Sequence, residues 1–317
     1  MKVIFYGDVF MKMRDTVLSY MKGHDVDILD GSAIEEKISS AEVLVTRPSI
    51  KIGGELLRRA KRLELMQMYG TGLEGVDFDV CREQGIAICN TPSAGTGNAE
   101  GVAEIMLLHM LLLGRKYSLA RENALSGRFF SPKGISLWRK TVCVIGLGNL
   151  GRVLSSRISA MGASVRGVNR SRLDESLLEE AGVSEFFPLN RLHEAVSGCR
   201  FVVAALALTD ETRGMFDEAF FRAMDRGSFF INVARGGLVD EPALIRALVD
   251  KHLAGAGLDV LDCEPPRTDN PLLFHPSVTM TPHIGGATDE SVKGIMSFIR
   301  ENIDRLSRGE APLSRQN

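Results

Sequence analysis

Short β-rich runs alternate with longer helical patterns along almost the whole chain, and this alternation constrains the fold most strongly. In the first hundred residues, strand-like runs occur at 3–6, 26–29, 43–46, 65–68 and 86–89. A second series occurs at 141–146, 164–168, 201–206, 228–233, 256–260 and 278–281. Strands separated by helices pair in parallel, with helices covering the sheet. The sequence therefore predicts an α/β protein with two doubly wound, Rossmann-like parallel-sheet domains.

Two clusters of small and turn-forming residues predict the domain boundaries. A chain of 317 residues is long for a single hydrophobic core. The clusters lie at 93–98 and 285–288, where turns and hinges are expected. An amphipathic helical stretch over 289–308 follows the second cluster and would pack back on the first domain. We therefore predict one discontinuous domain of residues 1–97 and 286–317, interrupted by a second domain of residues 98–285.

Composition and charge give no sign of a nucleic-acid-binding, membrane or metal-binding protein. The net charge of −2 gives no reason to expect a nucleic-acid partner. The most apolar stretch, Ile105 to Leu113, is too short to span a bilayer and contains His109. We expect a soluble cytoplasmic protein that does not bind membranes. The five scattered cysteines form no C-x-x-C pair, so we expect reduced, packed thiols and no metal site.

A glycine motif at the start of the second series indicates a dinucleotide site. The run from Gly146 to Gly151 reads G-x-G-x-x-G, follows a strand-like segment directly and opens a helical pattern. Gly146 permits the tight turn, Gly148 lets the backbone approach a pyrophosphate, and Gly151 lets helix and strand pack closely. Asn149 and Leu150 begin the helix, whose free N–H groups favour phosphates.

The end of the next strand predicts which dinucleotide is preferred. An NAD-binding domain usually has an acidic residue there, which binds the ribose hydroxyls. This chain instead has Asn169, Arg170 and Ser171, and arginine and small hydroxyl side chains favour a 2′-phosphate. We therefore predict a preference for NADP(H), with NAD(H) use possible; the alternative is that the arginines are solvated surface residues.

Three further motifs occur at 231–237, 257–266 and 281–288, each after a strand-like run. Together with the glycine motif, they resemble those of the D-isomer-specific 2-hydroxyacid dehydrogenase family. The resemblance covers nearly the whole chain, including residues 69–72 and 90–92 of the first domain. It implies that the first domain is a flavodoxin-like substrate-binding domain and that the second binds the dinucleotide.

The chemistry of this family explains three residue types in these motifs. Reduction of a 2-oxo acid needs a hydride at C2 and a proton on the carbonyl oxygen. Histidine side chains in general titrate near neutrality, so His283 is a residue type that can supply the proton. The Glu264 carboxylate would fix its tautomer and stabilise the imidazolium. Arg235 would bind the substrate and polarise its carbonyl. We predict these three residues as the catalytic set, with Arg235 and His283 also contacting substrate.

The resemblance implies further contacts and an oligomeric state. The backbone amides of Thr71 and Gly72 should bind the substrate carboxylate, and Asp259 should contact the nicotinamide side of the cofactor. The cofactor cleft should also be lined by segments that contain Thr209, Thr212 and Val233. Ala207 departs from the family, which more often has proline there. The resemblance also implies a homodimer, for which the helix at 101–113 is either an interface element or core.

The substrate and even the class of function stay open. We favour reduction of glyoxylate, hydroxypyruvate or a similar short 2-oxo acid. An alternative is a D-3-phosphoglycerate dehydrogenase-like enzyme, for which Arg47 and Lys51 could bind a phosphate or be solvated loop charges. A different class is a dinucleotide-sensing binding protein, like the corepressors that resemble this family. Substitution of His283 separates an enzyme from a sensor, because only an enzyme loses its function.

Overall fold

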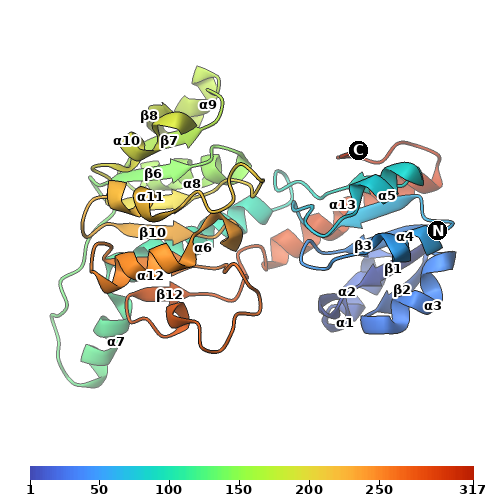
Figure 1. Cartoon of the computed structure of the whole chain (residues 1–317), viewed down its shortest axis with the longest axis horizontal. Helices are drawn as coiled ribbons and strands as arrows, with labels where there is room; N and C mark the ends of the chain where they lie inside the picture. The colour runs from blue at the N-terminus through green and yellow to red at the C-terminus, as the bar shows by residue number, and fades with distance from the viewer. The chain divides into compact units, whose positions relative to one another are not determined.

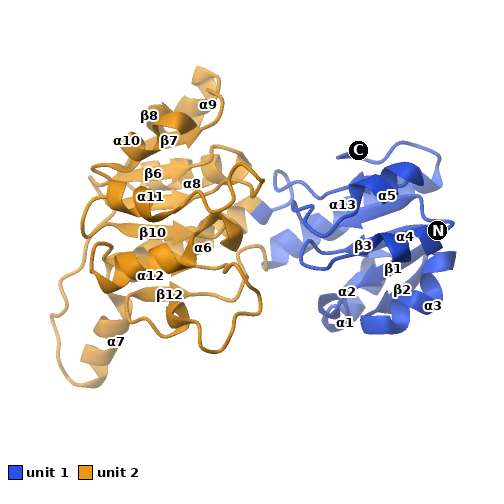
Figure 2. Ribbon diagram, in the orientation of Figure 1, with its two compact units in different colours: residues 1–98, 288–317 blue, residues 99–287 orange.

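The computed structural model describes all residues from 1 to 317, which form two compact units. Unit 1 comprises residues 1–98 and 288–317, and unit 2 comprises residues 99–287 (Figure 2). The boundaries predicted from sequence, 97/98 and 285/286, lie one and two residues from these. Both units contain a parallel sheet with helices, so the predicted fold class is confirmed.

Unit 1 is built on a five-stranded parallel sheet. Its strand order is β2-β1-β3-β4-β5, with bounds β1 Lys2–Tyr6, β2 Asp25–Leu29, β3 Val43–Thr46, β4 Leu65–Met68 and β5 Ala87–Cys89. The helices are α1 Asp8–Lys12, α2 Arg14–Tyr20, α3 Ile34–Lys37, α4 Gly54–Arg59, α5 Phe78–Glu83 and α13 Asp289–Ser307. Alternating strand residues bury two separate apolar clusters, one on each face of the sheet.

The last helix, α13, completes unit 1. Its buried residues Ile295, Met296, Ile299 and Ile303 recur at helical spacing and join the same cluster as Val3 of β1. The helix begins where the Thr288 side chain accepts a hydrogen bond from the Ser291 N–H, a typical N-cap.

Unit 2 contains a seven-stranded parallel sheet of order β12-β11-β10-β9-β6-β7-β8 (Figure 1). The strands are β6 Thr141–Ile145, β7 Ser164–Asn169, β8 Val183–Pro188, β9 Phe201–Ala204, β10 Phe229–Asn232, β11 Gly255–Leu258 and β12 Val278–Met280. The helices are α6 Asn98–Gly114, α7 Tyr117–Leu125, α8 Asn149–Ala160, α9 Glu175–Glu180, α10 Leu192–Val196, α11 Glu218–Ala223 and α12 Glu241–Val249. No helix of the chain is long and apolar enough to cross a membrane.

The strand order of unit 2 reverses direction between β9 and β6. From β6 the chain proceeds outward through β7 to β8, then returns to β9 on the other side of β6. In open parallel sheets, ligands bind outside the carboxyl ends of the strands at such a switch point. The loop that begins at Gly146 leaves β6 at this point.

Candidate active site

The glycine motif forms a tight turn between β6 and α8. Gly146 has a φ of +98°, and a Cβ on it would lie 2.6 Å from the Ala205 carbonyl oxygen, so glycine is required there. A Cβ on Gly151 would lie 1.8 Å from the Gly146 carbonyl oxygen, whereas Gly148 faces open space with nothing within 4 Å. Gly148 caps α8 without a side-chain hydrogen bond, so the first N–H groups of the helix, at Asn149 and Leu150, are open to a phosphate. The residues present therefore fit a dinucleotide.

The end of β7 carries no carboxylate. The Asn169 side chain accepts from the Leu147 N–H at 3.4 Å and donates to the Ser171 carbonyl oxygen at 2.9 Å. Arg170 approaches Glu211 at 3.4 Å, with both side chains about four-fifths exposed. An open depression of about 460 Å³ lies beside this segment and is lined by Arg170, Pro188, Leu189 and Asn190.

The three predicted catalytic residues all follow strands of unit 2 at one edge of the sheet. Arg235 follows β10, Glu264 lies in the loop after β11, and His283 follows β12. Because these strands are parallel neighbours, their carboxyl ends meet there. The His283 Nδ1 lies 2.5 Å from the Glu264 Oε2, and both side chains are partly exposed, at 48% and 31%. The structure thus joins a histidine to a carboxylate in a position that a small molecule can reach.

The Glu264 carboxyl is held in its charged form. Burial by itself raises its pKa, but the hydrogen bond and charge of His283, the Leu261 N–H and the charge of Arg235 together lower it below the ordinary value. The Leu261 N–H donates to Glu264 Oε1 at 3.0 Å, which leaves Oε2 for the imidazole. Arg235 itself donates to the Ala234 carbonyl oxygen at 2.8 Å.

Asp259 is buried in the turn that leads to His283. Its residue is 3% exposed, and its carboxylate accepts from Thr281 Oγ1 at 2.5 Å, the Ile284 N–H at 2.9 Å and the Gly285 N–H at 2.8 Å. Its carbonyl oxygen accepts from the His283 N–H at 2.8 Å. Asp259 therefore holds the turn that carries His283.

The remaining predicted cofactor residues of unit 2 also have local partners. The Val233 side chain is 5% exposed and belongs to the core. Thr209 and Thr212 lie in the loop after β9, where the Thr212 hydroxyl donates to the Ala207 carbonyl oxygen at 2.9 Å and accepts from the Thr209 N–H at 2.8 Å. These hydroxyls shape the loop, and a cofactor contact by Val233 would have to use its backbone.

His109 is a polar residue whose role sequence analysis missed. It is fully buried on α6, with Nδ1 2.8 Å from Thr279 Oγ1 and Nε2 3.0 Å from Thr281 Oγ1. Burial lowers its pKa to about 4, against a smaller opposing effect of the Asp259 charge. Because the Thr281 hydroxyl donates to Asp259, it accepts from His109, which fixes the neutral Nε2–H tautomer. The only sequence signal was one histidine within an apolar helix.

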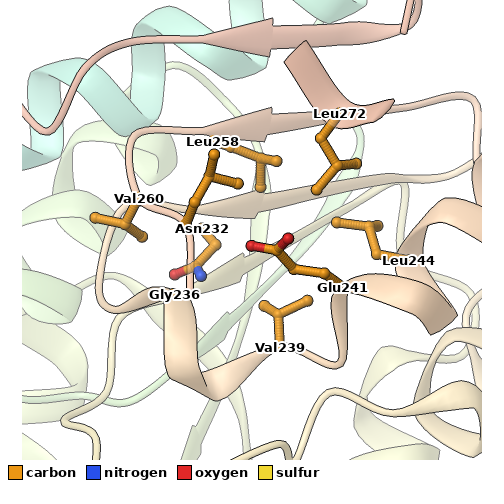
Figure 3. Close-up of a pocket in the computed structure, with 9 residues that line it drawn as sticks. Asn232, Gly236, Val239, Glu241, Leu244, Leu258, Val260 and Leu272 are labelled. Carbon is orange, nitrogen blue, oxygen red and sulfur yellow. The ribbon is translucent and has the colours of Figure 1, made fainter. Parts of the chain in front are cut away.

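Glu241, on α12, was also missed. Its Oε1 accepts from the Asp262 N–H at 2.8 Å and its Oε2 from the Asn270 side chain at 3.0 Å, so it anchors both ends of the loop that carries Glu264. Figure 3 shows its carboxylate among Leu244, Leu272 and other apolar residues around a cavity of about 10 Å³. That cavity has room for no more than one water molecule, so it is not a substrate site.

The predicted carboxylate-binding turn at Thr71 and Gly72 lies in unit 1, just after β4. Thr71 is exposed, and no group of the chain accepts a hydrogen bond from the N–H of Gly70, Thr71 or Gly72. The carbonyl of Gly70 instead accepts from the Thr91 N–H at 2.9 Å. These free N–H groups are therefore available to an anion.

Two negative predictions concerned metals and cysteines. No group of three or more His, Cys, Asp or Glu side chains is arranged to hold a metal ion. All five cysteines are free thiols, and four of them are buried. The prediction of packed thiols is wrong for Cys263, which is exposed in the loop next to Glu264.

Comparison with known proteins places the chain in a family. Residues 107–285, more than half of the chain, match the family described as D-isomer specific 2-hydroxyacid dehydrogenase, NAD binding domain. The chain therefore belongs to the D-isomer-specific 2-hydroxyacid dehydrogenases. The predicted family is confirmed, and with it the predicted class of enzyme, a D-2-hydroxyacid dehydrogenase that uses a nicotinamide dinucleotide.

Relatives with two different activities resemble the chain about equally. It is 33% identical over 90% of its length to the D-3-phosphoglycerate dehydrogenase of Methanocaldococcus jannaschii, and spans only 54% of that protein. It is also 33% identical over 87% of its length to the glyoxylate reductase of Pyrococcus furiosus, of which it spans 82%. The D-lactate dehydrogenase of Aquifex aeolicus, solved with NAD and lactic acid, shares 25% identity and a TM-score of 0.83 over 97% of this chain and 96% of that one.

Proposed function

We propose that the chain transfers a hydride between a nicotinamide dinucleotide and a short 2-oxo acid or D-2-hydroxy acid. The observation that carries the proposal is the His283–Glu264 pair, 2.5 Å apart, at the strand edge from which the Gly146 loop also starts. A histidine that a carboxylate holds in one tautomer is the group this chemistry needs, because it must give up and recover one proton in each cycle.

The proposed mechanism assigns one task to each residue. When bound, the reduced dinucleotide supplies the hydride that reaches C2 of the substrate. His283 gives the proton on its outer ring nitrogen to the carbonyl oxygen, and Glu264 stays ionised while the imidazole changes charge. The Arg235 guanidinium draws electron density toward that oxygen. In the oxidation direction, the neutral imidazole takes the hydroxyl proton back.

The exposed turn at Thr71 and Gly72 is the proposed site for the substrate carboxylate. Support comes from its free N–H groups, whose neighbouring carbonyls are held by other partners. A carboxylate bound there would accept hydrogen bonds from backbone groups, so the site recognises any short 2-oxo acid rather than one side chain.

The cofactor proposal is a preference for NADP(H). Support comes from the absence of a carboxylate at Asn169 and from Arg170, whose contact with Glu211 is exposed and long and therefore weak. A 2′-phosphate can replace that contact. The family and its solved member are described with NAD, so NADH is the necessary comparison.

Glyoxylate and hydroxypyruvate are the proposed substrates, in line with the Pyrococcus furiosus relative. The second candidate is 3-phosphohydroxypyruvate, which the Methanocaldococcus jannaschii relative favours. Arg47 is the residue that could bind the phosphate of this substrate. Its guanidinium lies on an exposed loop and donates to the neighbouring Ser49 hydroxyl at 3.1 Å, so a phosphate would compete with that contact.

A homodimer is the proposed assembly, and a segment of unit 2 supports it. We call residues 117–138, which include α7, the arm; α7 stands apart from the sheet of unit 2 in Figure 1. The arm exposes large apolar side chains, namely Tyr117, Leu119, Leu125, Phe129, Phe130 and Trp138. A concentration of such side chains marks a protein–protein interface, and we assign it to a second copy of the chain.

The decisive experiment follows nicotinamide absorbance with NADPH and, separately, NADH. The substrates are glyoxylate, hydroxypyruvate, pyruvate and 3-phosphohydroxypyruvate, with a His283→Ala variant as control. We expect turnover that prefers NADPH and is lost in the variant, and the best substrate separates the two candidates. Dinucleotide binding with no turnover of any of these acids would overturn the proposal in favour of a dinucleotide-sensing protein.

A further inference from the structure

The last residues of the chain are attached to the edge of β5. Arg315 forms an antiparallel bridge with Cys89, and the Gln316 N–H donates to the Ile88 carbonyl oxygen at 2.8 Å. The Asn317 side chain accepts from the Ile88 N–H at 2.9 Å. We call residues 313–317 the C-terminal tail. The tail thus covers a strand edge that would otherwise expose unpaired backbone groups.

Two tail side chains converge on Asn90, the residue after β5. The Ser314 hydroxyl donates to Asn90 Oδ1 at 2.6 Å, and the Gln316 side-chain amide donates to the same oxygen at 3.3 Å. On its other side, Asn90 Nδ2 donates to the Thr71 carbonyl oxygen at 2.9 Å. A backbone carbonyl can only accept, so the Asn90 amide nitrogen must face Thr71 and its oxygen must face the tail.

This chain of hydrogen bonds fixes the direction of one free N–H group. The Thr71 carbonyl and the Gly72 N–H belong to the same planar trans peptide and point in opposite directions. By holding the Thr71 carbonyl, Asn90 therefore aims the Gly72 N–H away from the Asn90 side chain. The Thr91 N–H holds the preceding peptide in the same way, without help from the tail.

We propose that Ser314 and Gln316 are positioning residues, which act through Asn90 on the Gly72 N–H and so set the affinity for the substrate carboxylate. The inference rests on the proposed carboxylate site at Thr71 and Gly72. It assigns a role in substrate binding to a polar tail far from the site in sequence. The affinity for the dinucleotide and the rate of the chemical step do not depend on these contacts.

The first test measures steady-state kinetics of a Ser314→Ala/Gln316→Ala variant. We expect KM for the 2-oxo acid to rise about three- to ten-fold, as for the loss of one or two hydrogen bonds. The kcat and the KM for the nicotinamide cofactor should stay within about two-fold of the parent. Ser307→Ala is the matched control, because that hydroxyl donates within α13 to the Asp304 carbonyl. A KM for the 2-oxo acid equal to that of the control would overturn the proposal.

Asn90→Ala tests whether the tail acts through Asn90. In that background, the double substitution in the tail should raise the KM no further. If the tail is purely structural, its double substitution should instead raise the KM for the 2-oxo acid equally in the parent and in Asn90→Ala. This result would contradict a positioning role.

A binding measurement separates failure of the inference from failure of the proposed site. Oxamate, a small 2-oxo carboxylate, is titrated into isotope-labelled protein while the amide signals of Thr71 and Gly72 are followed. We expect shifts in the parent and a several-fold higher midpoint in the tail variant. Equal midpoints overturn the tail's role alone. If the parent's two signals do not move although other signals show oxamate binding, the carboxylate site is wrong and the inference fails with it.

Discussion

His283 has a left-handed backbone conformation, with φ of +53°, which residues with a Cβ adopt only when their surroundings enforce it. Asp259 provides that enforcement, because its carbonyl and carboxylate accept from three consecutive N–H groups at 283–285. This backbone conformation places the imidazole beside Glu264. At the scale of single residues, the candidate site is therefore set by a buried acid behind an exposed histidine.

Glu264→Gln tests the imidazole–carboxylate pair. We expect kcat to fall about 100-fold, because the amide no longer stabilises the positive charge that His283 alternately carries. The pKa of Glu264 is lowered in the folded protein. The ion pair between His283 and Glu264 is therefore intact at pH values above the ordinary pKa of a carboxyl group, and it is lost only as the pH falls through the lowered pKa. Steady-state rates from pH 4 to 8 check both points, and His283→Ala gives the floor. Full activity in the glutamine variant would refute the assignment.

Because His109 is buried, we expect the free energy of unfolding to depend on pH. Its pKa of about 4 lies below the ordinary 6.5, so between these values the unfolded chain binds a proton that the folded chain does not. Stability is therefore unaffected above pH 6.5 and falls as the pH drops from 6.5 to 4, by about 1.4 kcal/mol per unit at most.

Urea unfolding at pH 7 and pH 5 measures this slope. His109→Gln should make the dependence shallower, whereas the same substitution at the exposed His193 should leave it unchanged. Identical slopes in the parent and the His109 variant would show that His109 is protonated in the folded state.

Sequence motifs identified Arg235, Glu264 and His283 as candidates because each has a residue type that the chemistry requires, just after a strand. They did not reveal His109 or the burial of Asp259. The position of His109 depends on α6 packing against β11, where a Cβ on Gly257 would lie 2.5 Å from the His109 Cβ, and Asp259 is held by residues 281–285. Contacts between positions some 150 residues apart leave no periodic signal in one sequence.

At the scale of elements, we expect opposite effects from alanine substitutions at two glycines of the 146–151 motif. Gly148→Ala should change stability by about 1 kcal/mol or less, because a Cβ meets nothing there, yet weaken dinucleotide binding at least about ten-fold. Gly151→Ala should destabilise unit 2 by about 2 kcal/mol or more, because its Cβ overlaps the Gly146 carbonyl. Thermal denaturation without cofactor and calorimetric titration with it distinguish the two effects.

Gly53→Ala is the matched control, since Gly53 also caps a helix and faces open space, but in unit 1. Gly53→Ala should change stability no more than Gly148→Ala does, and it should leave dinucleotide binding unchanged. If Gly148→Ala binds the dinucleotide as the parent does, the backbone there does not approach a phosphate.

Most strands could be predicted because parallel strands buried on both faces appear as continuous apolar runs. Strand β8, Val183–Pro188, was missed. It lies at the sheet edge, exposes Ser184 and Glu185, and ends in proline, so neither alternation nor a continuous apolar run marks it.

At the scale of the whole molecule, the exposed arm predicts self-association. Phe129 is 71% exposed, and we expect Phe129→Ser to shift the molecule from dimer to monomer because it removes apolar area from the interface. Sedimentation velocity over a range of concentrations measures the change. Phe274→Ser is the control, since Phe274 is equally exposed but lies outside the arm. A parent protein that stays monomeric at high concentration would rule out the proposed dimer.

The discontinuity of unit 1 has a consequence for the order of events on the ribosome. Residues 1–98 leave the exit tunnel first, but their sheet lacks the cover of α13, whose apolar residues are made only after unit 2 is complete. Unit 2 is one uninterrupted segment, so it can finish folding while the earlier residues still expose an apolar sheet face. During synthesis, unit 1 is therefore the later of the two units to mature, and its residues 1–98 would need chaperone protection in the interval.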